Sequence, residues 1–147
     1  MISGEQIEKY LAELPWKSAP FEGSDSWLVI LTNEAGQFNL TIEIQNEWLA
    51  FVINPLVENV VPKAIARLSY HLCRLNQDSV LVKYSLDDET DVAVAVELMR
   101  QGVEDVNFYQ AINMLNFYIE KQFKEIVRLS QDHKAPSQYL ADPGEDE

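Results

Sequence analysis

The spacing of apolar residues changes from helical to strand-like between residues 64 and 98. Large apolar residues first recur at intervals of three and four positions, as on one face of an α-helix, and then at every second position, as on one face of a strand. The first group is Ile65, Leu68, Leu72 and Leu75, and the second is Val80, Val82, Tyr84 and Leu86 followed by Val92, Val94, Val96 and Leu98. This segment is therefore predicted to be a helix followed by a β-hairpin.

The same reasoning predicts a short helix and three strands before this segment. Ser3 and Gln6 form a capping-box pattern, and the apolar residues after them keep helical spacing until Pro15. The strands are predicted at residues 27–32, 37–44 and 48–53. The second strand alternates strictly, so one face of the sheet should meet water, whereas the third is apolar on both faces and is expected to end at Pro55.

A long helix is predicted after the hairpin, over residues 105–128. Its inward stripe consists of Phe108, Ile112, Leu115, Ile119, Phe123 and Ile126. Residues 132–147 contain prolines and terminal carboxylates and are expected to form an acidic, mostly disordered tail. Residues 1–131 are then expected to form a single α+β domain, in the order helix, three-stranded antiparallel meander, helix, β-hairpin and long C-terminal helix.

Composition and charge narrow the classes of partner. The 147-residue chain carries 24 acidic and 11 basic residues, a net charge of −13 that repels nucleic acid and anionic lipid. No long uncharged apolar run predicts a membrane span, and the polar N-terminus does not resemble a secretion signal. The single cysteine, Cys73, suits a reducing compartment, so a cytoplasmic location is expected.

The sequence offers no pattern typical of an active site. His71 and Cys73 lie about 200° apart around a helix and cannot act on one metal or as a nucleophile and base. The acidic turn at residues 87–91 lacks the glycine and glutamate of a calcium loop. We therefore predict no catalytic residue, no metal site and no cofactor.

Two apolar surfaces are candidates for a subunit or partner interface. On a wheel of the last helix, Phe117 lies about 180° from Phe108, with Met114 and Tyr118 nearby. The alternative is that the sheet or residues 15–26 cover this strip. The second surface is the strand at 48–53, where one of two alternating sets should face away from the core. These sets are Trp48, Ala50 and Val52, or Leu49, Phe51 and Ile53.

The order of elements resembles a known fold family. The most telling stretch runs from Leu72-Cys73-Arg74-Leu75-Asn76-Gln77 into Val80-Leu81-Val82-Lys83-Tyr84-Ser85-Leu86-Asp87. It is similar to the type III secretion chaperone-like fold and to the YbjN-like bacterial sensory-transduction-regulator family, with related cyanobacterial and plastid proteins. This resemblance implies a small, acidic, cytoplasmic dimer that binds a segment of another protein and has no catalytic residues.

The expected function is therefore a non-enzymatic, homodimeric, chaperone-like module that holds a segment of a client protein. A regulatory or structural subunit of a larger complex is the alternative. An enzyme is the least favoured class, because its reactive groups would have to come from scattered residues such as Tyr84, Asp87 and Glu97.

Overall fold

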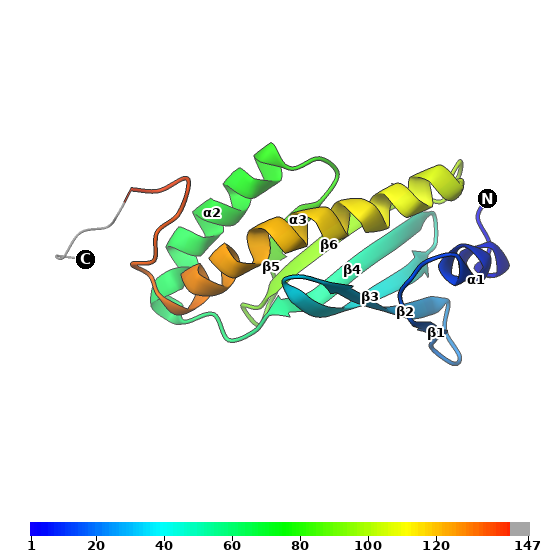
Figure 1. Ribbon diagram of the computed structural model, residues 1–147, viewed down its shortest axis with the longest axis horizontal. Coiled ribbons are helices and arrows are strands. Elements are labelled where there is room, and N and C mark those ends of the chain that lie inside the picture. The colour runs from blue at the N-terminus through cyan, green and yellow to red at the C-terminus, as the bar shows by residue number, and fades with distance from the viewer. Residues whose placement is uncertain (142–147) are drawn as a thin grey trace.

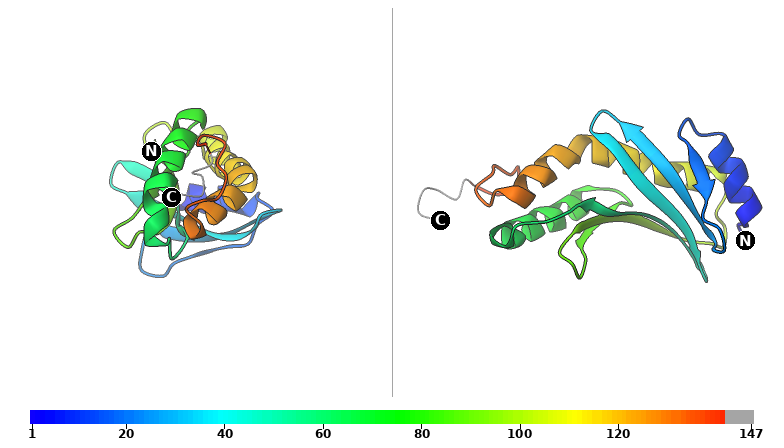
Figure 2. Two further views of the ribbon diagram at one scale, coloured as in Figure 1. Left: turned by 90° about the vertical axis from the view of Figure 1, so that its left-hand side faces the viewer. Right: turned by 90° about the horizontal axis from the view of Figure 1, so that it is seen from below.

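A curved antiparallel sheet and the helices that cover one of its faces make up the computed structural model, which describes residues 1–141 (Figures 1 and 2). In chain order the elements are α1 (Gly4–Ala12), β1 (Ser18–Pro20), β2 (Ser26–Asn33), β3 (Gly36–Gln45), β4 (Trp48–Val57), the 3-10 turn η1 (Pro62–Ala64), α2 (Ile65–Asp78), β5 (Lys83–Leu86), β6 (Val92–Met99) and α3 (Asp105–Gln131). The predicted α+β class and order of elements are confirmed.

The sheet order is β1-β2-β3-β4-β6-β5, and all neighbouring strands are antiparallel. The predicted meander and hairpin therefore form one continuous sheet, because β6 pairs with β4.

Strand β1 was not predicted. The expected end of β4 at Pro55 is wrong, since the strand resumes pairing at Val57 after a shift in register. β5 begins at Lys83, later than its apolar pattern indicated, because Leu81 has a left-handed backbone conformation with φ of 73°.

Helices α2 and α3 lie on the same face of the sheet, and α1 packs at one end of that face (Figure 2). In β4, Leu49, Phe51 and Ile53 point toward the helices and are buried. Their neighbours Trp48, Ala50 and Val52 point to the other face, which no helix covers within residues 1–141. Of the two alternating sets of this strand, the one that faces away from the core is therefore Trp48, Ala50 and Val52.

The inward stripe of α3 supplies much of the core. Five of the six residues predicted for it are completely buried, namely Phe108, Ile112, Leu115, Ile119 and Ile126. The sixth, Phe123, is half-buried and packs edge-on against Phe38 with ring centroids 4.9 Å apart. Phe108 contacts the rings of Tyr10 and Phe51 and so joins α1, α3 and the sheet.

Asn76 near the end of α2 fastens that helix to β5. Its side-chain amide Nδ2 donates to the carbonyl oxygen of Tyr84 at 2.9 Å, and the backbone N–H of Tyr84 donates to Asn76 Oδ1 at 2.6 Å. The side chain of one residue therefore satisfies both backbone polar groups of another.

The chain continues past α3 and packs back against α2 and α3 (Figure 1). We call residues 135–141 the C-terminal strap. The sequence led us to expect a mostly disordered segment from Asp132 onward, but residues 132–141 are held by hydrogen bonds, and Ala135 is buried. The remaining part of that tail, residues 142–147, lies outside the described residues.

Candidate interaction surfaces

An open apolar groove of about 720 Å³ runs along α3 on the side away from the sheet. We call it the α3 groove, and it is lined by Val106, Tyr109, Gln110, Asn113, Met114, Phe117 and Tyr118. The three residues predicted on this helix, Met114, Phe117 and Tyr118, are brought together here. Phe117 is 56 % exposed and Val106 is 68 % exposed, and both lie on this one face, so the groove presents a contiguous apolar patch to solvent.

Contacts on both flanks of α3 explain why Phe117 faces outward. On one flank the side-chain amide of Asn33, in the β2–β3 hairpin, donates to Asn116 Oδ1 at 3.0 Å. On the other flank the backbone N–H of Val80 donates to Tyr118 Oη at 2.9 Å. Phe117 lies between these two anchored positions, so neither the sheet nor residues 15–26 cover it.

The two ends of the α3 groove differ in charge. Glu13 and Asp105 lie beside Tyr109 and Asn113 at the end where α3 begins. Burial raises the pKa of the Tyr109 phenol, and the two carboxylates raise it further. At the other end Lys121 Nζ lies 5.8 Å from the centroid of the Phe117 ring.

The open face of the sheet carries a smaller apolar patch. Trp48 is 46 % exposed and lies directly opposite Met99 of β6, which is 57 % exposed. Of the other two residues predicted on this face, Ala50 is buried between Glu43 and Glu97, and Val52 is half-buried.

Trp48 is therefore the only one of the three predicted strand residues that offers a large exposed side chain. Met99 was missed by our sequence analysis. The period-two pattern of residues 92–98 already assigned position 99 to the outward face, so the signal was present.

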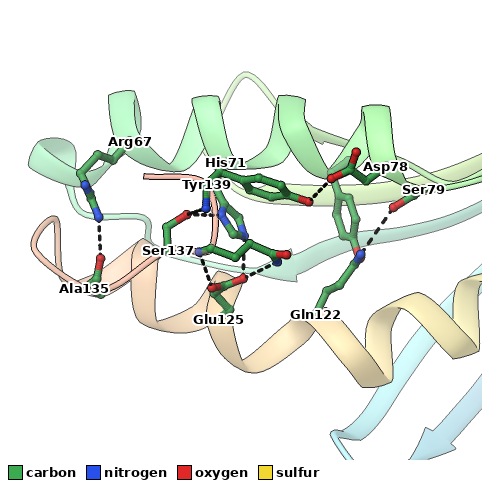
Figure 3. Close-up of polar contacts among 11 residues, drawn as sticks. Arg67, His71, Asp78, Ser79, Gln122, Glu125, Ala135, Ser137 and Tyr139 are labelled. Carbon is green, nitrogen blue, oxygen red and sulfur yellow. Dashed lines mark hydrogen bonds and ion pairs between the residues drawn. The ribbon is translucent and has the colours of Figure 1, made fainter. Parts of the chain in front are cut away.

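A polar cluster that sequence analysis missed lies between α2 and α3 (Figure 3). His71 Nδ1 is 2.8 Å from Ser137 Oγ, and His71 Nε2 is 3.2 Å from Glu125 Oε1. Burial lowers the pKa of His71 below its usual value of 6.5, Glu125 opposes this change, and Arg67 adds to it. The His71 ring is completely buried beneath the strap, so a substrate cannot reach it while the strap is in place.

The helical spacing of α2 held a clue to this cluster. His71 lies three positions after Leu68 and four before Leu75, on the buried face of the helix. A histidine on such a face needs polar partners, but Ser137 and Glu125 are too far away in the chain for spacing to identify them.

In the acidic turn between β5 and β6, the Asp87 carboxylate forms hydrogen bonds within the turn itself. Asp87 Oδ1 accepts hydrogen bonds from the backbone N–H groups of Glu89 and Asp91, both at 2.9 Å, and these bonds lower the pKa of Asp87. Within residues 1–141 no group of three or more histidine, cysteine or acidic side chains is arranged to hold a metal ion. Over the same range, no helix combines the length and apolar character needed to cross a bilayer.

Comparison with known proteins gives one family and several structural neighbours. A family model, "YbjN: Putative bacterial sensory transduction regulator", matches residues 3–126. No curated protein matches the chain.

Among solved structures, YbjN from E. coli has a TM-score of 0.62 at 18 % identity, covering 84 % of this chain and 93 % of its own. A chain of the HopA1–SchA chaperone–effector complex has a TM-score of 0.55 at 14 % identity, covering 79 % and 86 %. A chain of the heterodimeric ExoU–SpcU complex from the type III secretion system of Pseudomonas aeruginosa has 0.51 at 23 % identity, covering 84 % and 96 %. The expected fold family is thereby confirmed.

Proposed function

We propose that this chain, which belongs to the YbjN family, is a non-enzymatic homodimeric module that holds a segment of a client protein. The α3 groove is the observation on which the proposal rests. Exposing its aromatic and aliphatic side chains to water is unfavourable, so burying them against another molecule would stabilise the assembly. The cytoplasm is the proposed location.

Self-association through α3 suits the distribution of charge along the groove. In a two-fold dimer, each patch meets the same patch of the other copy. If two α3 helices cross antiparallel near Asn113, Lys121 of one copy approaches Asp105 and Glu13 of the other. The axis then passes close to Met114, and each Phe117 packs toward the Val106 end of its mate. The apolar contact supplies affinity and the end charges set the orientation.

The open face of the sheet is the proposed site for the client. Trp48 and Met99 provide an apolar anchor there, and Glu43 and Glu97 flank it with negative charge. A client segment that pairs apolar with basic side chains would complement this face. The chaperone–effector complex among the structural neighbours supports a protein ligand for this class of fold.

The first experiment separates the two surfaces by placing a carboxylate on each. Phe117→Asp should convert the dimer into a monomer with an unchanged far-UV circular dichroism spectrum, as measured by light scattering. Met99→Asp is the matched control, since Met99 is equally exposed but lies on the sheet. It should leave the dimer intact and should abolish capture of proteins that co-purify with the wild type. A Phe117→Asp dimer as stable as the wild type would refute the role of the groove.

Charge exchange tests the antiparallel arrangement. Lys121→Glu should weaken the dimer, and adding Asp105→Lys in the same chain should restore it, because the two substituted charges again meet across the axis. Failure of the second substitution to restore the dimer would exclude this orientation while leaving the groove itself as the interface.

A regulatory or structural subunit of a larger complex is the alternative, and the family description, which names a regulator, favours the regulatory form. In that case, the wild type should co-purify with a fixed partner at constant stoichiometry. A chaperone should instead release its client once assembly is complete.

A further inference from the structure

The C-terminal strap lies between α2 and α3 and contacts residues of both helices chiefly through polar groups (Figure 3). We call the place that it occupies between the two helices the cleft. Residues 137–140 of the strap form a tight turn, in which the backbone N–H of Leu140 donates to the carbonyl oxygen of Ser137 at 3.2 Å. The cleft therefore holds a compact turn of peptide.

Two cleft residues recognise the backbone of the strap. Arg67 donates from Nη2 to the carbonyl oxygen of Ala135 at 2.6 Å and from Nη1 to that of Ala141 at 3.1 Å. Glu125 Oε2 accepts from the backbone N–H of Gln138 at 3.1 Å. Every peptide has these groups, so Arg67 and Glu125 could hold a segment from another chain in the same way.

The cleft also contacts side chains of the strap, and the Gln138 amide Nε2 donates to Glu125 Oε1 at 2.9 Å. The Ser137 hydroxyl meets His71 Nδ1 at 2.8 Å, and the Tyr139 hydroxyl donates to Asp78 Oδ2 at 2.8 Å. The Tyr139 ring also lies 4.8 Å from the guanidinium carbon of Arg74. These contacts select a hydroxyl at the first position of the turn and a tyrosine at the third.

The strap contributes little to the core. Ala135 is its only fully buried residue, whereas Ser137, Tyr139 and Leu140 are half-buried. Within the strap, only Ala135 belongs to the main core and Tyr139 packs against it, whereas Leu68 and Ile126 are core residues of α2 and α3. A segment held by partly exposed polar contacts can open locally without unfolding the domain. Opening leaves Arg67 and the Nδ1 atom of His71 without their strap partners.

We propose that the cleft between α2 and α3 is a peptide-binding site that the strap occupies in cis. Its ligand is a tight turn from a partner protein with serine or threonine at the first position and tyrosine at the third. The strap competes with this ligand and so lowers its apparent affinity. This proposal does not depend on the α3 groove or on the dimer proposed above.

The experiment weakens the strap in the full chain and offers its sequence in trans. The probe is a fluorescent peptide, Ala-Pro-Ser-Gln-Tyr-Leu-Ala, identical to residues 135–141. It should bind the Ser137→Ala, Tyr139→Phe double variant at least roughly tenfold more tightly than the wild type, as measured by fluorescence anisotropy, because the competitor in cis is weakened. A peptide with the same two substitutions is the matched control and should bind the variant weakly.

Equal binding of the two peptides, or of the probe to wild type and variant, would overturn the proposal. A dimer of the variant in which a second copy supplies its strap would do the same. Hydrogen exchange on the unaltered protein gives an independent readout. The amide of Gln138 should exchange at least about tenfold faster than that of Ile119 in the core of α3. Exchange of both amides only through global unfolding would contradict a strap that opens.

Discussion

The two sides of α3 differ both in polarity and in whether another part of the chain covers them. The side that carries Val106 and Phe117 is apolar and stays open, whereas the side that carries Glu125 is polar and lies beneath the strap. The free energy of solvation favours the reverse arrangement, because burying apolar surface is favourable and burying polar surface is costly. The chain covers the polar side with its own strap, whereas the cover that we propose for the apolar side is a second copy of the chain.

The largest expected effect contrasts the inner face of α3 with the open one. Phe108→Ala should lower the free energy of unfolding by about 3–5 kcal/mol, because it leaves a cavity among Tyr10, Phe51 and the helix. Thermal unfolding at one protein concentration should show a fall in Tm of more than roughly 6 °C. Phe117→Ala in a monomeric background should change stability by less than about 0.5 kcal/mol. Comparable losses for both would show that the groove belongs to the core.

A smaller loss is expected when the polar side is uncovered. Deletion of residues 135–147 removes the contacts of Arg67, His71 and Asp78 with the strap and should cost about 2 kcal/mol, or roughly 4–8 °C in Tm. Deletion of residues 142–147 alone is the control, since it spares all of these contacts. An unpacked tail, as the sequence suggested, would leave Tm unchanged in both deletions, and that result would contradict the packing seen here.

The smallest effect concerns pH. Burial holds the pKa of His71 below 6.5, so the unfolded chain binds a proton more readily than the folded one. Stability should therefore be highest above pH 6.5 and should decrease as the pH falls from there toward the folded-state pKa. Denaturant unfolding at several pH values should show a shallower pH dependence for His71→Gln than for the wild type. Identical slopes would indicate that His71 does not titrate on unfolding.

Periodicity was sufficient for the existence and order of every helix and strand except β1, and for the outward position of Phe117. Each of these depends on residues within one helix or strand, where spacing fixes direction. The same logic could have placed Met99 beside Trp48, because both lie on the outward face of their strands.

The strap could not be predicted in this way. Its contacts join Arg67 to Ala141 and His71 to Ser137, pairs separated by 74 and 66 positions. Composition favoured disorder because the segment buries little apolar surface, but polar contacts hold it instead. The pairing of the edge strand β1 with β2 was also missed, because β1 is only three residues long and its residues are exposed.

The double hydrogen bond between Asn76 and Tyr84 limits how a ligand can attach. β5 is an outermost strand, and the amide of Asn76 takes the main-chain N–H and C=O of Tyr84, which an incoming strand would need at that position. At the opposite border, β1 is short and ends in Pro20, which has no N–H to offer. Each border therefore disfavours sheet extension at one position, Tyr84 or Pro20, which favours ligands that dock through side chains over ligands that add a strand.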